Sequence, residues 1–215
     1  MLQRIKFFLK KHEWIIPLGL FIIFLAFTLS GITWGAPSTW HPDEIVVRSI
    51  KALHGEWKFS ETNFDYPDLP QYTMLFLGKL LLTLGKSDGD ILIASRVLSA
   101  VLAGLTVVLT YNIARRIGGS VLTAGLSGLL LISVSEMPHN GRFAHNDTYL
   151  VFFVTLSVLC LLNYVNHRNK LWLYASFLTV GMAASSKYIG GSLVLAPLIV
   201  YLFEQRNNIK KQWFS

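Results

Sequence analysis

The chain has 215 residues, of which 53% are hydrophobic and only 14% are charged. Soluble domains usually carry charges on about a quarter of their residues, so this composition excludes an ordinary soluble domain and indicates a membrane protein. The net charge of +7 does not indicate a nucleic-acid-binding protein, because the Lys and Arg residues form short clusters between apolar runs instead of a basic stripe. The single cysteine, Cys160, excludes a disulfide framework within the chain.

Six apolar stretches approach or reach the ~20 residues that cross a hydrocarbon core. The first follows a basic N-terminus and is too long for a signal peptide, so we expect an uncleaved anchor. The last two are short, and we expect their ends to border a polar cavity or a thinned part of the membrane. The predicted spans are residues 15–34, 91–114, 119–136, 147–166, 171–187 and 188–204.

Residues 70–85 form a further apolar segment, which is either a seventh span or a helix on the membrane surface. With a surface helix, eleven of the 19 basic residues and only two of the 12 acids share the side of the N-terminus. With a seventh span, most of those basic residues change sides, against the positive-inside rule. The charges therefore predict an outer loop, residues 35–90, with interfacial helices and with both termini cytoplasmic. In the same topology, residues 206–215 are predicted to form a basic cytoplasmic tail.

In this topology, four polar clusters share one outer face of the protein. Any single cluster is commonly a solvated loop, but ionisable groups close to a membrane interior are costly and mark functional sites. Four on one face predict such a site. They are WHPDE (40–44), NFDYPD (63–68), NGRFAHND (140–147) and SSKY (185–188).

The residue types in these clusters suit a transfer in which a hydroxyl loses its proton while a phosphate departs. An aspartate can act as general base, and Lys or Arg can neutralise the charge that develops on the phosphate. A phosphate carried by a lipid would arrive within the bilayer, close to this face. The clusters therefore predict a polyprenyl-phosphate-linked donor.

The order of these segments resembles the type-C glycosyltransferases, in the branch of the protein O-mannosyltransferases and the lipid A aminoarabinose transferases. The similarity spans residues 1–205. It rests on WHPDEIVVRSIKALHGEW, FDYPDLPQYTMLFLGKLLLTLG, SRVLSAVLAGLTVVLTYNIARRIGG, GRFAHNDTYLVFF and GMAASSKYIGG, in that order. Each motif is weak alone, and the ordered set is specific. Such enzymes are longer, so we expect this chain to be a fragment, the N-terminal part of one. A degenerate product and a partial enzyme that needs a partner are the alternatives.

The resemblance implies an all-α, polytopic membrane module of the GT-C fold. It also implies an inverting transfer of a sugar from a polyprenyl-phosphate donor to an acceptor hydroxyl on the extracytoplasmic face. The acceptor would belong to a protein, a lipid or a polysaccharide. The partners are thus the donor, the acceptor and the bilayer, with no nucleic acid.

Roles for individual residues follow from the same resemblance. The catalytic residues would be Asp43 as the general base, Glu44 beside it at a helix start, and Asp147 as a second acid. The donor-phosphate ligands would be Lys187, Arg48 and Arg142. The substrate-binding residues would be His41, Asp65, Tyr66, His145 and Tyr188.

Structural explanations compete with several of these roles. Asp43 and Asp147 could instead cap helices, since Asp is favoured at helix starts. Lys187 could extend from a short hairpin towards water, and Tyr188 could belong to an interfacial aromatic belt.

Two arginines at span ends also have a structural explanation. Arg96 and Arg142 would then pair with Asp90 or Glu136, and we prefer this explanation to phosphate binding.

A metal is not predicted, although a divalent ion stays possible. Asp65, His41 and His145 share a face without a recognisable ligand spacing. The aminoarabinose transferases have Glu-Lys before the loop proline, with the Glu near a metal. Asp65 and Tyr66 occupy those positions here, so the acid is kept and the lysine is lost.

Two other classes of function remain open. A carrier or flippase for a lipid-linked anion would also collect charges on one face, but it needs polar residues deep in several spans. A non-catalytic scaffold could pack through small residues such as Gly104, Gly125 and Gly128. The scaffold leaves the acids of the outer face unexplained.

Overall fold

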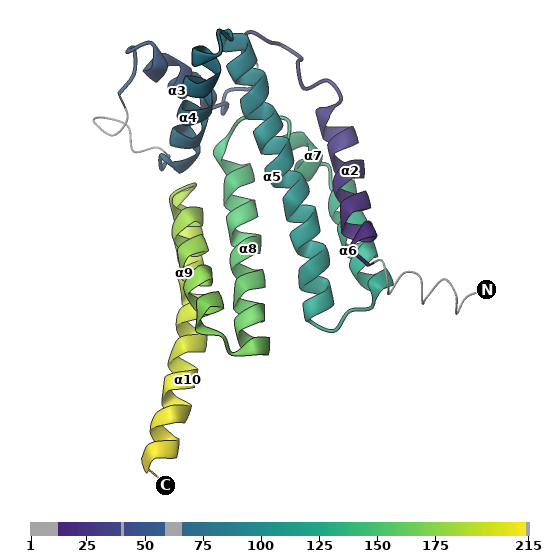
Figure 1. The fold of residues 1–215 in the computed structure, drawn as a ribbon, viewed down its shortest axis with the longest axis vertical. Helices are drawn as coiled ribbons and strands as arrows, with labels where there is room; N and C mark the ends of the chain where they lie inside the picture. Colours follow the sequence, from purple (N-terminus) through teal and green to yellow (C-terminus); the bar gives the residue numbers. More distant parts are fainter. Residues whose placement is uncertain (1–12, 40, 59–65, 214–215) are drawn as a thin grey trace, which may run out of the picture.

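A computed structural model describes residues 13–39, 41–58 and 66–213, with side chains up to residue 205. All regular elements in these residues are helices (Figure 1), which confirms the predicted all-α fold class. The helices are α2 (Ile15–Leu29), α3 (Val46–Leu53), α4 (Leu69–Thr83), α5 (Asp88–Arg116), α6 (Val121–Ser133), α7 (Glu136–Asn140), α8 (Asn146–His167), α9 (Lys170–Ala184), the 3-10 helix η1 (Tyr188–Val194) and α10 (Leu195–Trp213).

Each predicted span contains a helix, although the bounds differ. The helices α5 and α8 and the stretch Tyr188–Gln205 are long and apolar enough to cross a membrane, whereas α2 and α6 are apolar but shorter. The first helix ends at Leu29, five residues before the predicted end of the span, because Gly31 adopts φ +75 and starts a series of turns. At the other end, α10 continues to Trp213, into the predicted tail.

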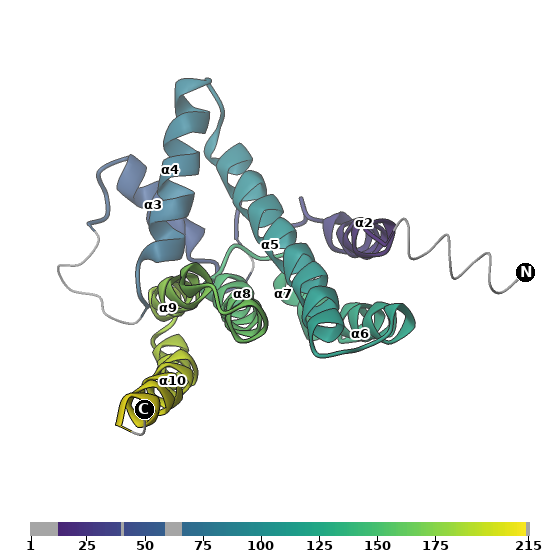
Figure 2. The same ribbon diagram turned by 60° about the horizontal axis from the view of Figure 1, so that its bottom comes forward.

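The long helices form a bundle, and the two helices of the outer loop lie at one end of it. α8 and α9 form a hairpin, and α5 packs against α8, α2 and α6 (Figures 1 and 2). α3 and α4 pack on each other beside the start of α5. We call this the α3–α4 end. The sequence predicts an interfacial helix where α4 lies, and its position relative to a membrane stays a prediction.

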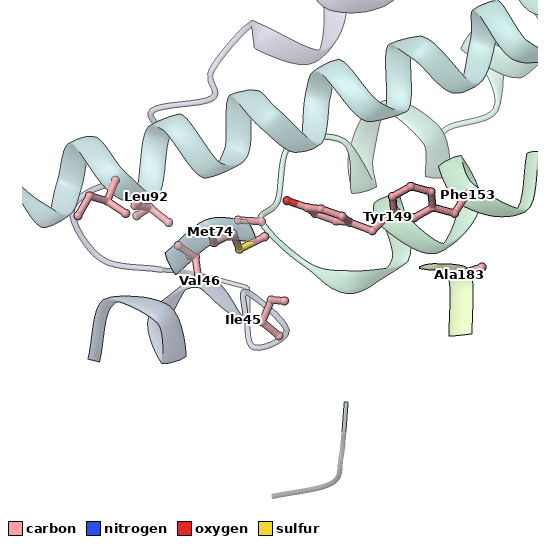
Figure 3. Close-up of a cluster of buried hydrophobic side chains, with 9 residues drawn as sticks. Ile45, Val46, Met74, Leu92, Tyr149, Phe153 and Ala183 are labelled. Carbon is pink, nitrogen blue, oxygen red and sulfur yellow. The ribbon is translucent and has the colours of Figure 1, made fainter. Parts of the chain in front are cut away.

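Side chains from both parts meet in a buried apolar cluster beneath α3 and α4 (Figure 3). Burial of apolar side chains contributes about 25 cal/mol per Å² of area removed from water, so this cluster anchors the outer-loop helices on the bundle. Its members are Ile45, Val46, Met74, Ile91, Leu92, Ala144, Tyr149, Phe153 and Ala183.

Polar side chains fix the starts of the bundle helices. Ser87 and Asp90 form a capping box at the start of α5, each side chain bonding the backbone N–H of the other. Asn169 caps α9. Arg168, at φ 56, forms the left-handed turn that reverses the chain between α8 and α9. The local sequence therefore specifies where α8 ends and where α9 begins.

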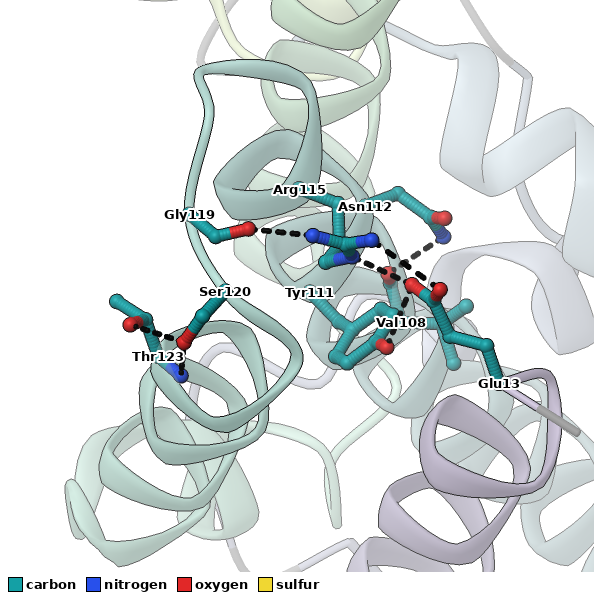
Figure 4. Close-up of polar contacts among 8 residues, drawn as sticks. All are labelled: Glu13, Val108, Tyr111, Asn112, Arg115, Gly119, Ser120 and Thr123. Carbon is teal, nitrogen blue, oxygen red and sulfur yellow. Dashed lines mark hydrogen bonds and ion pairs between the residues drawn. The ribbon is translucent and has the colours of Figure 1, made fainter. Parts of the chain in front are cut away.

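At the opposite end of the bundle, a polar network ties the N-terminal segment to α5 (Figure 4). The Glu13 carboxylate accepts hydrogen bonds from Arg115 and from the Tyr111 hydroxyl, and the bonds from Arg115 lower the pKa of Glu13. Arg115 also donates to the Gly119 carbonyl. Arg115, one of the basic residues that the charge distribution assigns to the side of the N-terminus, thus lies at this end.

Two adjacent glycines after α9 give a matched test of packing. A Cβ on Gly190 would lie 2.6 Å from the backbone of Ala183, whereas one on Gly191 would lie 3.5 Å from the Ala184 side chain. We expect Gly190→Ala to lower the free energy of unfolding by about 1–3 kcal/mol, because the backbone must shift. Gly191→Ala should stay within about 0.5 kcal/mol of the wild type. Denaturant titration in detergent micelles measures both, and equal losses would show that η1 does not pack against α9 as described.

Candidate functional site

The α3–α4 end is organised around a buried ion pair between Glu44 and Arg96. Arg96 Nε and Nη2 donate to the two carboxylate oxygens over 2.7 and 2.8 Å, and both side chains are at most 1% exposed. Arg96 Nη1 also donates to the carbonyls of Ile32 and Trp34. Arg96 therefore joins α5 both to the turns that follow α2 and to the first part of the outer loop.

This arrangement corrects the expected partners of the two arginines at span ends. Arg96 is structural, as preferred, but its partner is Glu44 and not Asp90, which belongs to the capping box. Arg142 donates to the Phe27 carbonyl over 2.8 Å and not to Glu136. A buried guanidinium binds the acid that can accept two parallel hydrogen bonds, and sequence proximity does not decide which acid that is.

An open cleft of about 590 Å³ lies beside the ion pair. Asp43 is exposed in this cleft, whereas its neighbour Glu44 contributes to the wall and is engaged by Arg96. Of the two adjacent acids, only Asp43 can therefore face a substrate. The lining residues are Thr39, His41, Pro42, Asp43, Glu44, Ile45, Val47, Arg48, Lys51, Trp57 and Tyr66.

Arg48 lies between two aromatic rings on one side of the cleft. Its guanidinium carbon is 5.4 Å from the centre of the Trp57 ring and 5.8 Å from that of Tyr66. Planar guanidinium groups stack on aromatic faces and keep their charge there. The charge of Arg48 also acts on Asp68. Burial raises the pKa of the Asp68 carboxyl, and the positive charge of Arg48 opposes that increase. The two rings thus hold a cation at a defined position in the cleft.

Histidines and one phenylalanine connect the first outer loop to the loop before α8. The His41 ring stacks on Phe143 with 4.6 Å between centroids, and the His41 and His145 centroids are 6.2 Å apart. His139 contacts the edge of the same Phe143 ring. The clusters at 40–44 and 140–147, about a hundred residues apart in sequence, therefore lie side by side.

His145 begins α8 and prepares the position of Asp147. The His145 Nδ1 atom accepts a hydrogen bond from the backbone N–H of Asp147, and the ring is only 5% exposed. Asp147 Oδ1 lies 2.6 Å from Lys187 Nζ, and both side chains are about two-fifths exposed. The N-terminus of α8 and the chain after α9 thus bring a carboxylate and an amine together.

These contacts correct two structural expectations. Asp43 does not cap α3, whose N-cap residue is Ile45, and the Glu44 carboxylate bonds Arg96 and makes no cap hydrogen bond. Asp147 does not cap α8, because the capping acceptor is the ring of His145.

The buried cap at His145 predicts a pH dependence of stability. Burial lowers the pKa of His145 below its ordinary 6.5, and the Asp147 charge opposes this effect in part. The folded state therefore holds the neutral ring. The corresponding stability is present above pH 6.5 and is lost as the pH falls through the lower pKa of the folded state.

We expect His145→Asn to weaken this acid sensitivity, because Asn can accept the capping hydrogen bond without titrating. The measurement is the difference in unfolding midpoint of wild type and variant at pH 7.5 and pH 5. An unchanged difference in the variant would assign the acid sensitivity to other groups.

The remaining candidates lie in different places. Arg142 lines a separate cavity, on the Arg96 side of the ion pair, and Tyr188 is 59% exposed. Asp65 lies outside the described residues. Among the residues that the structure describes, no group of three His, Cys, Asp or Glu side chains could hold a metal ion.

Sequence reasoning missed Lys51 and Trp57 in the cleft wall and Phe143 between the histidines. Lys51 lies one turn beyond Arg48 in a helix and was identifiable from that spacing. No sequence signal marks Trp57 or Phe143, because their contacts depend on how the loops fold.

Comparisons with known proteins identify the family and the fold of the chain. The family described as dolichyl-phosphate-mannose-protein mannosyltransferase matches residues 55–215. An undecaprenyl phosphate-alpha-4-amino-4-deoxy-L-arabinose arabinosyl transferase of Pseudomonas fluorescens is 28% identical over 89% of this chain and 35% of its own length. Dolichyl-phosphate-mannose–protein mannosyltransferase 3 of Saccharomyces cerevisiae is 31% identical over 66% of this chain and 17% of its own length.

Among solved structures, the S. cerevisiae protein O-mannosyltransferase Pmt1-Pmt2 complex bound to the sugar donor is similar in fold, with a TM-score of 0.67. The similarity covers 86% of this chain and 28% of that chain at 21% identity. The chain thus spans about a third of the length of the first of these relatives. Because the family match covers most of its residues, the chain belongs to the dolichyl-phosphate-mannose-protein mannosyltransferase family of glycosyltransferases.

Proposed function

We propose that this chain contains the part of a membrane glycosyltransferase active site that supplies the catalytic acids. The enzyme transfers a sugar from a polyprenyl-phosphate donor to an acceptor hydroxyl on the extracytoplasmic face, with inversion. The observation that carries the proposal is the exposed Asp43 in a 590 Å³ cleft that also holds the stacked Arg48.

In this mechanism, Asp43 is the general base. It accepts the proton of the acceptor hydroxyl as the oxygen attacks the anomeric carbon, and the bond to the donor phosphate breaks. Asp43 suits this step because its backbone N–H, and not its carboxylate, bonds His41. Glu44 has a supporting role: its pairing with Arg96 fixes the backbone that presents Asp43.

The cations would stabilise the departing phosphate. Arg48 lines the cleft. Lys187 forms an ion pair with Asp147, and both side chains are partly exposed. In our proposal, Lys187 exchanges the carboxylate for the donor phosphate when the donor binds, and Asp147 holds the amine in place beforehand. His41 and Tyr66 line the cleft and contact the substrate, whereas His145 acts through Asp147.

The test is release of free polyprenyl phosphate from a sugar-labelled donor by membranes that contain the protein. A transferase releases the lipid phosphate and labels an acceptor, while a carrier moves the donor and leaves it intact. We expect Lys187→Gln to lower the apparent affinity for the donor by about tenfold, since it removes a charged hydrogen bond. Transport of intact donor without any release would contradict the proposal and favour a carrier.

Accessible cysteines test the proposed face. In a Cys160→Ser background, cysteines at positions 43, 66 and 188 should react with a membrane-impermeant thiol reagent in intact cells. A cysteine at position 168 should react only after permeabilisation. Labelling of position 188 from the side opposite to position 43 would make α4 a membrane span and would exclude the proposed site.

A further inference from the structure

A second cavity, of about 280 Å³, lies on the other side of the Glu44–Arg96 pair. It is formed by the turns that follow α2, by Arg96 of α5 and by the loop before α8. It is too small for most whole small-molecule ligands, which occupy roughly 300–1,000 Å³. The lining residues are Ser30, Gly31, Ile32, Trp34, Arg96, Arg142 and Phe143.

Arg142 supplies this cavity with hydrogen-bond donors. Its Nη2 atom donates to the Phe27 carbonyl, whereas the buried Nε–H has no acceptor among the described residues. A buried donor without an acceptor costs about 1–3 kcal/mol, and more when the group is charged. An oxygen of a ligand in the cavity would remove this cost.

The charge of the cavity wall is positive. Arg96 is neutralised by Glu44, so Arg142 contributes a cation that the described part of the chain does not offset with an ion pair. A guanidinium matches the oxygens of a phosphate group in both charge and geometry. The cavity therefore suits one phosphate group.

The cavity is separate from the proposed reaction cleft. Glu44 lines the cleft and Arg96 lines the cavity, and the two side chains are bonded to each other. His41 lines the cleft and Phe143 lines the cavity, and their rings are stacked. Both pairs stand between Arg142 and Asp43.

An apolar surface leads to the cavity from the outer side of the bundle. Trp34 lines the cavity and is 61% exposed, and Phe27, whose carbonyl binds Arg142, is also 61% exposed. Ile23, one turn before Phe27, is exposed as well. α2 lies at the edge of the bundle, beside α6 (Figures 1 and 2). A ligand that combines a phosphate with an apolar chain fits both surfaces.

From these observations we propose that the Arg142 cavity binds a phosphate group, independently of the reaction cleft. Two sources carry this chemistry, namely the head group of an anionic phospholipid and a free phosphate ion. The apolar surface of α2 favours the phospholipid.

The test measures binding of three probes to the purified protein in a neutral detergent: dioleoylphosphatidylglycerol, dioleoylphosphatidylcholine and inorganic phosphate. Native mass spectrometry counts retained lipid, and the shift of the unfolding midpoint reports affinity for each probe. We expect phosphatidylglycerol to bind the wild type, and Arg142→Gln to weaken that binding by about tenfold or more. Lys170→Gln, which removes a cation at the opposite end of the bundle, should leave it unchanged.

A second variant covers the case in which Arg142→Gln does not fold. Ser30→Leu reduces the cavity without touching the guanidinium, and it should weaken binding to a similar extent. Equal binding of inorganic phosphate and phosphatidylglycerol, both dependent on Arg142, would support the site with free phosphate as its ligand. Equal binding of phosphatidylcholine, or binding that neither variant weakens, would overturn the proposal. None of these readouts involves sugar transfer, so they are independent of the proposed enzyme activity.

Discussion

Asp43→Asn should lower sugar transfer by about 10²–10⁴-fold while the protein remains folded, because an amide cannot accept the acceptor proton. Asn has the same shape, and the Asp43 side chain is exposed, so neither packing nor the buried Glu44–Arg96 pair changes. Release of polyprenyl phosphate from a labelled donor gives the rate. Stabilisation of the protein by the donor should persist, since the phosphate contacts are intact.

The matched control is Glu56→Gln, which makes the same acid-to-amide change on an exposed residue of the outer loop that does not line the cleft. This variant should retain wild-type transfer. If Asp43→Asn also retained it, another group would have to serve as the base, and Asp43 would only be a solvated residue of the loop.

Arg96→Met should cause the largest loss of stability among single substitutions in the described part of the chain. It would leave the buried Glu44 carboxylate without its ion-pair partner and the carbonyls of Ile32 and Trp34 without their donor. Breaking a buried ion pair in this way costs about 3–5 kcal/mol. Unfolding in mixed micelles, followed by far-UV circular dichroism, measures the loss.

A double-mutant cycle separates the pair from the rest of the effect. Glu44→Gln removes the charge that Arg96→Met strands, so the double variant should lose less stability than the sum of the single changes. It should still be less stable than the wild type, because the two carbonyls remain unpaired. Additive losses would mean that the two side chains do not interact in the folded protein.

The sequence was sufficient to predict the fold class and the convergence of the polar clusters. Long apolar runs specify helices, and the distribution of basic residues specifies which ends lie together. The contacts of His41 with Phe143, and of Lys187 with Asp147, agree with that convergence.

The pairing of individual charges could not be predicted. Glu44 and Arg96 are 52 residues apart, and nothing in either local sequence distinguishes this pairing from one between Arg96 and the nearer Asp90. The same limit applies to His145, since Asp147 is the residue that propensity favours at a helix start. The geometry of the loop decides which side chain reaches the free N–H group.

The α8–α9 hairpin sets a distance along the bundle. With a rise of about 1.5 Å per residue, the 22 residues of α8 extend about 33 Å and the 15 residues of α9 about 22 Å, and the turn at residues 185–187 lengthens the α9 side. The Asp147–Lys187 contact thus depends on the lengths of two helices that start from the turn at Arg168. One extra residue in either helix would rotate everything beyond it by about 100° and separate the two side chains. The lengths of the two helices therefore determine whether Asp147 and Lys187 meet. Substitutions along the hairpin should disturb this contact far less than insertions or deletions of residues.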